Sequence, residues 1–402
     1  MKIGIVHFYL ATESGDPRLV FSLAQALKAE GHQVQIYTTE FDPQFFPELH
    51  KGLEIIEVKT PQSFRSLMGA TSILGKIKER IYWSRLSKKL VKKVATRLDS
   101  DLDVLDLHND ASFRIAPLYR QKNPKAHILW TMHNPPFYHE KKGSLLATLL
   151  SRAYACKEFV IAKRKVRYID GLITLDELRR EMALKLKKPI RVLRIPVDFE
   201  KFYAPVRPYD KSHGPVTLLS MGSLSSFRRY EDTIQAVAHL KKKGHSAKAV
   251  LICKDFWKSG DYKQKLLDLV KKENLEDDVD FWFDGANEEE LKKVREGSHA
   301  FIFPNIVNIW GMAAFEAMAS GLPLVVVRVT SVAEVLKDGQ NCLMVDPERP
   351  DQIADRVHDL ISDPDLYRVI GQAGQDFVKE KLSWKAYAKS LVDFISNPQQ
   401  NP

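Results

Sequence analysis

Short apolar segments rich in β-branched residues alternate with helical patterns along nearly all of this 402-residue chain. Strands joined by helices pair in parallel, and the helices then cover both faces of the sheet. The alternation occurs twice, and the chain is too long for one ordinary core. We therefore predict an α/β fold of two doubly wound, Rossmann-like domains that face each other across a cleft. The expected strands are Ile3–His7, Gln33–Thr38, Leu53–Val58, Asp103–His108, His127–Met132, Gly171–Leu175 and Arg191–Ile195, then Val216–Met221, Ala247–Cys253, Val279–Phe283, Ala300–Phe303, Leu322–Val327 and Cys342–Val345.

The polar, proline-bearing residues 199–215 mark the expected hinge between the two domains. The predicted N-terminal domain covers residues 1–198, and the predicted C-terminal domain covers residues 199–383. The final helical segment, residues 384–397, is a candidate to pack back on the first domain. A ligand shared by two such domains would lie between them.

Basic residues are concentrated in the first half of the chain. Residues 1–200 contain 34 Lys and Arg against 22 Asp and Glu, whereas the whole chain has a net charge of +10. This excess predicts an anionic partner, for which nucleic acid and anionic lipid both qualify, with a solvated basic face as the alternative. Nucleic acid ranks last because the sequence has no recognisable reading motif or stacking platform, so we expect no nucleic-acid partner.

Two stretches that combine basic and apolar residues are candidates for contact with an anionic membrane surface. One is residues 63–80, and the other begins at Lys141–Lys142 and continues through Leu145, Leu146, Leu149 and Leu150. Plain surface helices are the alternative interpretation. No apolar run is long enough to span a bilayer, and the three cysteines form no Cys-x-x-Cys pair. We expect a cytoplasmic protein that is a candidate for peripheral attachment to the inner face of the membrane.

The segment from Asn308 to Pro323 lies between two expected buried strands and has a helical pattern. Its helix would begin where the first of these strands ends, which is where open parallel sheets bind ligands. Amides at the helix start, around Gly311 and Met312, favour anionic groups such as phosphates. Glu316 would place a carboxylate within a small apolar surface, and a ligand hydroxyl is one candidate partner for it.

Polar residues also follow the expected strands of the first half. The run Ser14-Gly15-Asp16 opens a helix, and its glycine allows close approach of a phosphate or a substrate hydroxyl. The triple-glycine fingerprint is missing, which disfavours a dinucleotide oxidoreductase. His108 and His133-Asn134 lie at the ends of expected strands. A lone histidine is more often structural, but two at strand ends favour a functional role, above all for His133.

Cationic residues follow the expected strands of the second half. Arg228 and Arg229 come after Val216–Met221, and guanidinium groups are suited to a diphosphate, although a solvated surface pair is the alternative. Lys254 would add a cation at the same edge of the sheet. Glu334 follows Leu322–Val327 and would either start a helix or face the same ligand.

Together these positions resemble the retaining glycosyltransferases of the GT-B fold, family 4. The resemblance covers nearly the whole chain. It is carried by Gly31-His32-Gln33-Val34, residues 195–202, Trp310-Gly311, residues 315–319, Gly321-x-Pro323, residues 338–341 and Trp384. It implies that Glu316, the second glutamate of a Glu-x7-Glu motif, holds the ribose of the donor. Arg228 stands at the lysine that binds the donor diphosphate, and His133 at the active-site histidine. Gly15 stands at the second glycine of an N-terminal pair, and Glu334 at the acidic residue near the nucleotide.

The sequence departs from the family pattern at four of its motif sites. Ser14 stands at the first glycine of the N-terminal pair. Asn308 replaces the first motif glutamate, and an amide can still hydrogen-bond a sugar hydroxyl but carries no charge. Ser223 replaces the phosphate-binding arginine, for which Arg229 is a candidate to compensate. Thr330-Ser331 replaces a glycine pair that precedes Glu334.

The resemblance implies retaining transfer of a hexose-type sugar from a nucleotide-sugar donor to a hydroxyl of a lipid-linked or cell-surface glycan. No metal and no cofactor is expected, because cations would face the diphosphate and no Asp-x-Asp cluster follows a strand. The alternative is a catalytically impaired relative that binds a nucleotide-sugar or a partner in a glycan-assembly complex. The expected catalytic residues are His133, Glu316 and Asn308; the donor-binding residues are Gly15, Ser223, Arg228, Arg229, Lys254, Gly311, Met312, Glu316 and Glu334; and the acceptor-binding residues are Ser14, Asp16, His108 and Asn134.

Overall fold

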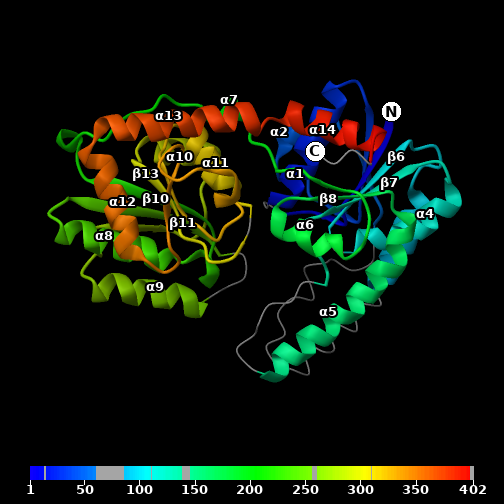
Figure 1. The fold of residues 1–402 in the computed structure, drawn as a ribbon, viewed down its shortest axis with the longest axis horizontal. Coiled ribbons are helices and arrows are strands. Elements are labelled where there is room, and N and C mark those ends of the chain that lie inside the picture. The colour runs from blue at the N-terminus through cyan, green and yellow to red at the C-terminus, as the bar shows by residue number, and fades with distance from the viewer. Residues whose placement is uncertain are drawn as a thin grey trace. The chain divides into compact units, whose positions relative to one another are not determined.

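A computed structural model describes residues 1–12, 15–59, 86–109, 111–137, 145–255, 260–308 and 310–398. Ser14, residues 63–80 and Lys141–Lys142 lie outside this part of the chain. The chain divides into two compact units, Met1–Arg194 with Trp384–Pro402, and Ile195–Ser383 (Figure 1). Each unit contains a parallel sheet flanked by helices, which confirms the predicted α/β fold. None of the described helices has the length and apolarity needed to cross a membrane.

The first unit is built on a seven-stranded parallel sheet with the order β5-β3-β1-β6-β7-β8-β9. From β1 the chain adds strands toward one edge, and from β6 it adds them toward the other, so the order reverses between β1 and β6. The strands are β1 (Lys2–Val6), β3 (Gln33–Thr38), β5 (Glu54–Glu57), β6 (Val104–His108), β7 (His127–Met132), β8 (Gly171–Thr174) and β9 (Ile190–Val192).

Two apolar clusters cover the two faces of this sheet. On one face, Phe21 of α1 packs with Leu391 and Phe394 of α14. Gly171 in β8 lies so close to α14 that a Cβ atom there would be 2.8 Å from the ring of Phe394. The helices are α1 (Gly15–Ala29), α2 (Pro47–His50), residues 86–97, α4 (Ala116–Lys122), α5 (Leu145–Lys165), α6 (Glu177–Leu184) and α14 (Trp384–Ser396). The last helix of the chain therefore completes the core of the first unit.

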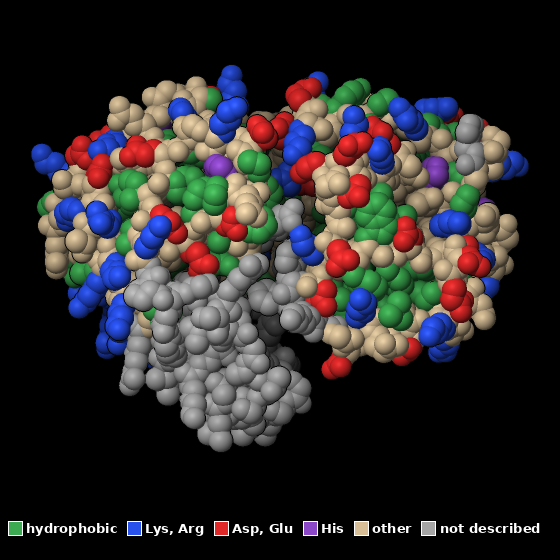
Figure 2. Space-filling model, turned by 180° about the vertical axis from the view of Figure 1, so that it is seen from behind, with side chains coloured by type: hydrophobic (Ala, Val, Ile, Leu, Met, Phe, Trp, Pro, Cys, Tyr) green, Lys and Arg blue, Asp and Glu red, His purple; other side chains and the backbone are tan. Residues whose placement is uncertain are grey.

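The second unit has a six-stranded parallel sheet with the order β12-β11-β10-β13-β14-β15, which reverses between β10 and β13. Its strands are β10 (Val216–Ser223), β11 (Ala247–Lys254), β12 (Val279–Trp282), β13 (Ala300–Phe303), β14 (Leu324–Val327) and β15 (Leu343–Val345). Its helices are α7 (Phe199–Phe202), α8 (Tyr230–Lys242), α9 (Gly260–Lys272), α10 (Glu288–Glu296), α11 (Met312–Ala319), α12 (Pro350–Ser362) and α13 (Pro364–Lys381). On the face that Figure 2 shows, charged side chains of both signs are spread over the described residues, with apolar groups between them.

The structure differs from the sequence prediction in several places. Residues 199–215 are not a free hinge, because α7 is helical, Phe202 is buried, and Gln375 Nε2 donates to the Ala204 carbonyl at 2.6 Å. β14 begins at Leu324 rather than Leu322. A short parallel pair, β2 (Tyr9–Leu10) and β4 (Glu40–Phe41), was not predicted.

Candidate functional site

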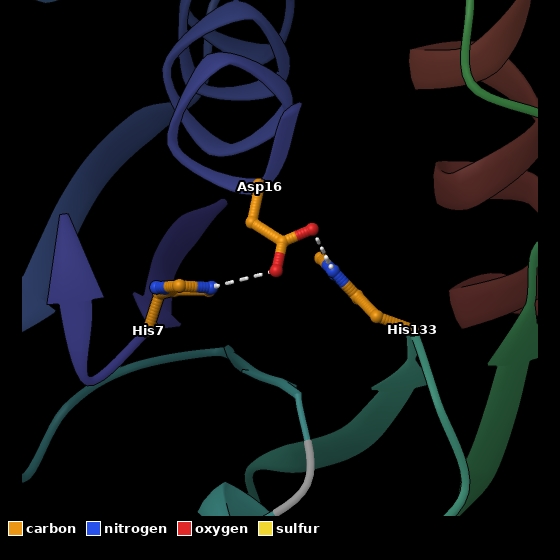
Figure 3. A group of neighbouring side chains, drawn as sticks. All are labelled: His7, Asp16 and His133. Atoms are coloured by element: carbon orange, nitrogen blue, oxygen red, sulfur yellow. Dashed lines mark hydrogen bonds and ion pairs between the residues drawn. The ribbon is translucent and has the colours of Figure 1, made fainter. Parts of the chain in front are cut away.

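The point where the strand order of the first unit reverses carries a cluster of polar side chains. Open parallel sheets bind ligands outside the carboxyl ends of their strands at such a point. His7 follows β1, His108 is the last residue of β6, and His133 follows β7. Asp16 lies in the first turn of α1, and Figure 3 shows its carboxylate between the imidazoles of His7 and His133.

Four side chains at this edge of the sheet form a continuous series of hydrogen bonds. We call this series the histidine chain, and its members are Asp106, His108, His133 and Asp16. Asp106 Oδ2 lies 2.9 Å from His108 Nε2, and His108 Nδ1 lies 3.1 Å from His133 Nε2. His133 Nδ1 lies 2.9 Å from Asp16 Oδ1. Asp106, His108 and His133 are buried, whereas the side chain of Asp16 is 54% exposed. Asp16 is therefore the member of the chain that a substrate can reach.

Both carboxylates of the histidine chain are ionised at neutral pH. Partial desolvation by the surrounding protein opposes the ionisation of Asp16, but the charge of His133 and its hydrogen bond hold the pKa of Asp16 well below its ordinary value. Burial also opposes the ionisation of Asp106, and here the charge and hydrogen bond of His108, with Thr131, lower the pKa of Asp106. Each carboxylate therefore accepts a hydrogen bond from an imidazole nitrogen that carries a proton.

His7 is the neutral member of the cluster. Burial lowers the pKa of His7 to about 3. The backbone N–H of Tyr9 donates to His7 Nδ1 at 3.3 Å, and the side-chain amide nitrogen of Asn109 lies 3.1 Å from His7 Nε2. His7 Nε2 lies 4.0 Å from Asp16 Oδ2, beyond hydrogen-bond distance.

His7, Asp16 and His133 also form the one group of three potential metal ligands found among the described residues, with ligand atoms within 4.8 Å of one another. An imidazole binds a metal through a nitrogen that carries no proton. His133 Nδ1 lies 2.9 Å from Asp16 Oδ1, so a metal at this nitrogen would have to displace the proton of that hydrogen bond. The absence of a metal stays an expectation.

Arg179 of α6 supports the turn that contains His133 and Asn134. Its Nε donates to the carbonyl of His133 at 2.5 Å, and one of its terminal nitrogens donates to Asn134 Oδ1 at 2.8 Å. Of the expected acceptor residues, the structure brings Asp16 and His108 together through His133. The amide of Asn134 accepts a hydrogen bond from Arg179 and is not a member of the histidine chain.

The second unit brings its own predicted residues to the point where its strand order reverses. The loop after β10 is tied to the end of β11, because Leu224 N–H donates to the Lys254 carbonyl at 2.9 Å. The same loop is tied to the segment after β13, because Ile306 N–H donates to the Phe227 carbonyl at 3.1 Å. Residues that follow β10, β11 and β13 therefore meet at one edge of the sheet.

Arg228 is the cation at the centre of this edge. Its guanidinium packs on Gly222, where an added Cβ would lie 2.9 Å from the Arg228 Cζ atom. Its Cζ lies 6.0 Å from the centroid of the Phe303 ring. Its Nε is buried and has no hydrogen-bond partner among the described residues, and burial lowers the pKa of Arg228. A buried cationic donor without a partner is costly, so this position favours an anionic ligand.

Helix α11 begins beside the same Phe303 ring. A Cβ atom added to Gly311 would lie 2.3 Å from that ring, so only glycine fits at this helix start. Gly311 precedes the helix and has no side chain to cap it, and Met312 is the first helical residue. Glu316 lies in the second turn and is buried, at 6% exposure. The Phe303 ring thus lies next to both Arg228 and Gly311, which is the start of α11 and part of the predicted donor motif.

The contacts of Arg229 differ from the expected donor contact. Its guanidinium pairs with Asp232 at 2.7 Å, Glu231 at 3.1 Å and Glu348 at 3.5 Å. Three carboxylates therefore satisfy this side chain, and its main contribution is to hold the turn before α8. Ser223, which stands at the position of the phosphate-binding arginine in the resembling family, has its hydroxyl 3.4 Å from that of Ser225.

Two of the departures from the family pattern contact each other. Ser331 Oγ donates to Asn308 Oδ1, and Asn308 Nδ2 donates to Glu334 Oε1 at 3.2 Å. The amide of Asn308 can donate to Glu334, which a carboxylate at position 308 could not do. The hydroxyl of Ser331 completes the arrangement, so these substitutions fit one another.

Sequence reasoning missed four residues of these sites. His7 and Asn109 follow β1 and β6, and their side chains lie 3.1 Å apart. Asp106 shares a face of β6 with His108 because strand side chains alternate, and this spacing could have identified it. Asn305 is 1% exposed, and its Nδ2 has no hydrogen-bond partner among the described residues. Asn305 gave no sequence signal beyond its position just after a strand.

Comparison with known proteins places this site in context. Residues 206–377, slightly less than half of the chain, match the family described as glycosyl transferases group 1. An uncharacterized glycosyltransferase of Methanocaldococcus jannaschii is 31% identical over 176 residues, which is 44% of this chain and 43% of that protein. A sucrose synthase of Denitrovibrio acetiphilus is 30% identical over 105 residues, covering 25% of this chain and 13% of the relative. The chain thus matches less than half the length of these relatives.

Solved structures resemble both units of the chain together. Sucrose-phosphate synthase from Thermosynechococcus elongatus superposes with a TM-score of 0.73 at 17% identity, covering 98% of each chain. Anabaena HepE, solved in complex with UDP, superposes with a TM-score of 0.72 at 12% identity, covering 98% of this chain and all of that one. The fold of this chain is therefore the GT-B fold.

Proposed function

We propose that this protein is a retaining glycosyltransferase that moves a hexose-type sugar from a nucleotide-sugar donor to a hydroxyl of a lipid-linked or cell-surface glycan. One observation carries the proposal. The guanidinium of Arg228 is buried with an unpaired Nε at the reversal point of the second sheet, and it shares the Phe303 ring with the start of α11. A donor diphosphate supplies the anion that such a site favours.

Arg228 and the amides at the start of α11 would stabilise the charge that develops on the leaving diphosphate. Glu316 and Asn308 would hold hydroxyl groups of the donor, and Glu334 would orient the Asn308 amide through its hydrogen bond. The match of residues 206–377 to group 1 glycosyl transferases supports this assignment. So does the UDP complex of HepE, a protein of the same fold.

A membrane-borne acceptor is supported by the exposed face of α5. Leu149 and Val160 are 53% and 47% exposed, and Ala153 and Cys156 are also exposed. At about 100° per residue these four side chains share an arc of roughly 60° on the helix. The exposed basic residues that flank the arc are Arg152 and Lys163 on one side and Lys157 and Arg164 on the other.

This pattern suits the boundary between lipid headgroups and acyl chains. Apolar side chains enter the boundary, and flanking bases meet anionic headgroups. None of the described exposed positions of α5 carries an acidic side chain, and Glu158 is buried against Arg114. We therefore propose peripheral attachment to the cytoplasmic face of the membrane.

A second candidate function is binding without transfer, as a subunit of a glycan-assembly complex. Asn308, Ser223 and Thr330 favour it, because each replaces a residue of the donor site in the resembling family. A thermal-shift screen of nucleotides and nucleotide-sugars tests both functions, since a ligand that binds only the native state raises the melting temperature.

Donor transfer or hydrolysis that disappears in Glu316→Ala would support the enzyme, with Glu380→Ala as a control at an exposed position of α13. A raised melting temperature without turnover would support the binding subunit. If no nucleotide or nucleotide-sugar raised the melting temperature, both the enzyme and a nucleotide-binding subunit would be rejected.

A further inference from the structure

The segment that follows β13 contains a buried amide group without a partner. Asn305 is 1% exposed, and its Nδ2 has no hydrogen-bond partner among the described residues. An amide that leaves water without gaining a hydrogen bond destabilises the folded state. Buried side chains of native proteins are nearly always hydrogen-bonded, so this exception needs a reason. A ligand that supplies the missing acceptor is one such reason.

Arg228 presents a second buried donor at the same edge of the sheet. Its Nε also lacks a partner within the part of the chain that the structure describes. The chain neighbours of the two residues are tied together, because the Ile306 N–H donates to the Phe227 carbonyl at 3.1 Å. The strands that lead to them, β10 and β13, pair in parallel. The Asn305 and Arg228 segments therefore leave the sheet side by side.

The two unmatched donors stand out because other polar side chains in this region have partners. Ser220 Oγ, within β10, donates to the Ile302 carbonyl of β13 at 2.9 Å. The guanidinium of Arg229 pairs with three carboxylates. The unmatched nitrogens of Asn305 and Arg228 thus do not reflect a generally poor hydrogen-bond network at this edge.

We propose that Asn305 is a further donor-binding residue, and that its Nδ2 and Arg228 Nε donate to oxygens of the same diphosphate. A diphosphate has several acceptor oxygens, so one anion can satisfy both nitrogens. Hydrogen bonds to an ionised acceptor are also stronger than those between neutral groups. This step rests on the proposed function, because it takes the anion to be the diphosphate of the nucleotide-sugar.

The chemistry of the two atoms favours a phosphate oxygen over a sugar hydroxyl. Both unmatched atoms are nitrogens that donate, and a guanidinium cannot accept a hydrogen bond. An ionised phosphate only accepts, and it also matches the charge of Arg228. A hydroxyl would leave that charge unmatched and would need an acceptor for its own proton. Asn305 therefore adds a directed hydrogen bond to a site whose charge comes from Arg228.

Calorimetric titration of the full chain with inorganic pyrophosphate and with UDP, GDP, ADP, CDP and dTDP tests this proposal. Asn305→Leu should weaken the affinity for the diphosphate that binds best by about tenfold or more, measured on the folded fraction. Its urea unfolding midpoint should not fall, because the variant removes a buried amide that lacks a partner. Asn305→Ala, which adds no volume, should lose affinity in the same way. Gln340→Leu, at an exposed position of the second unit, should change neither quantity.

Asn305→Asp identifies the chemical group that position 305 meets. A carboxylate repels a phosphate but accepts a hydrogen bond from a hydroxyl, so this variant should bind diphosphates more weakly than Asn305→Leu. Affinity that Asp restores would overturn the assignment to the diphosphate. Wild-type affinity in Asn305→Leu and Asn305→Ala, with or without a lower unfolding midpoint, would overturn the role of Asn305 and leave the proposed function intact. A wild-type protein that binds none of these diphosphates would overturn both.

Discussion

At the residue scale, two consecutive arginines have opposite surroundings. Arg228 has a buried Nε that lacks a partner among the described residues, whereas Arg229 is paired with three carboxylates. Removing a buried charge without a partner relieves its desolvation, so Arg228→Met should raise the unfolding free energy of the ligand-free protein by about 1 kcal/mol. The same variant should weaken nucleotide binding by at least about tenfold, or about 1.4 kcal/mol.

Arg229→Met is the matched control for this prediction. It leaves Asp232 buried without its cation, and burial already raises the pKa of Asp232. We expect a loss of about 2 to 4 kcal/mol in unfolding free energy, measured by urea unfolding. Nucleotide affinity, measured by calorimetry on the folded fraction, should change less than in Arg228→Met. Equal losses of stability in the two variants would contradict the assignment of Arg228 to an anion.

The sequence predicted which residues lie at the carboxyl ends of the strands but not their hydrogen bonds. Position after a strand indicated Arg228 and His133, because parallel strands end at one edge of the sheet. Nothing in the sequence indicated that Ser331 would contact Asn308, since 23 residues separate them and only the folded loops bring them together. Arg229 was predicted to bind the donor, because spacing alone cannot show that three carboxylates already surround it.

At the element scale, strands were easier to predict than the contacts of helices. Every strand predicted from an apolar run is present with boundaries shifted by a few residues, whereas the two-residue strands β2 and β4 are too short to give a pattern. Helix α14 follows the second unit in sequence but packs in the first, on Gly171. This placement agrees with the expectation that residues 384–397 pack back on the first domain, although amphipathicity alone does not identify the sheet that a helix covers.

Helix α5 gives the prediction at this scale. Vesicles of phosphatidylglycerol and phosphatidylcholine should co-sediment the protein, and vesicles of phosphatidylcholine alone should bind it weakly, because headgroup charge contributes about 1 kcal/mol per basic residue near the surface. The double variant Arg152→Glu, Lys157→Glu should reduce binding to the anionic vesicles by about tenfold or more. The control is Lys271→Glu, Lys272→Glu, at two exposed positions of α9.

Binding that is independent of anionic lipid, or equal losses in the two double variants, would reject α5 as the membrane-facing element. Leu149→Gln separates the apolar contribution from the charged one, since it removes an apolar side chain from the exposed arc without changing the charge. Its effect should persist at high salt, which screens the contribution of the bases.

At the scale of the whole molecule, both units place their polar residues by the same topological rule. The order of strands reverses between β1 and β6 in the first unit and between β10 and β13 in the second. The histidine chain lies at the first reversal point and Arg228 at the second. Strand–helix alternation predicts parallel sheets, but the order of the strands, and so the position of each reversal, is a tertiary property that periodicity does not encode.

The buried groups of the first unit predict how stability depends on pH. His7 stays neutral in the folded protein down to about pH 3, whereas an unfolded histidine titrates near 6.5. Between these values the unfolded chain binds more protons, so stability falls on acidification, by up to about 1.4 kcal/mol per pH unit from this group. The pKa values of Asp16 and Asp106 are also lowered, so their stabilising contributions are present above the unfolded value of 3.8 and decline below it.

His7→Gln removes the contribution of His7 and should flatten the dependence of unfolding free energy on pH between 6.5 and 4.5, measured by urea unfolding. His239→Gln, in α8 of the second unit, should leave the wild-type slope unchanged, and an equally steep slope in His7→Gln would show that His7 is not the buried neutral group.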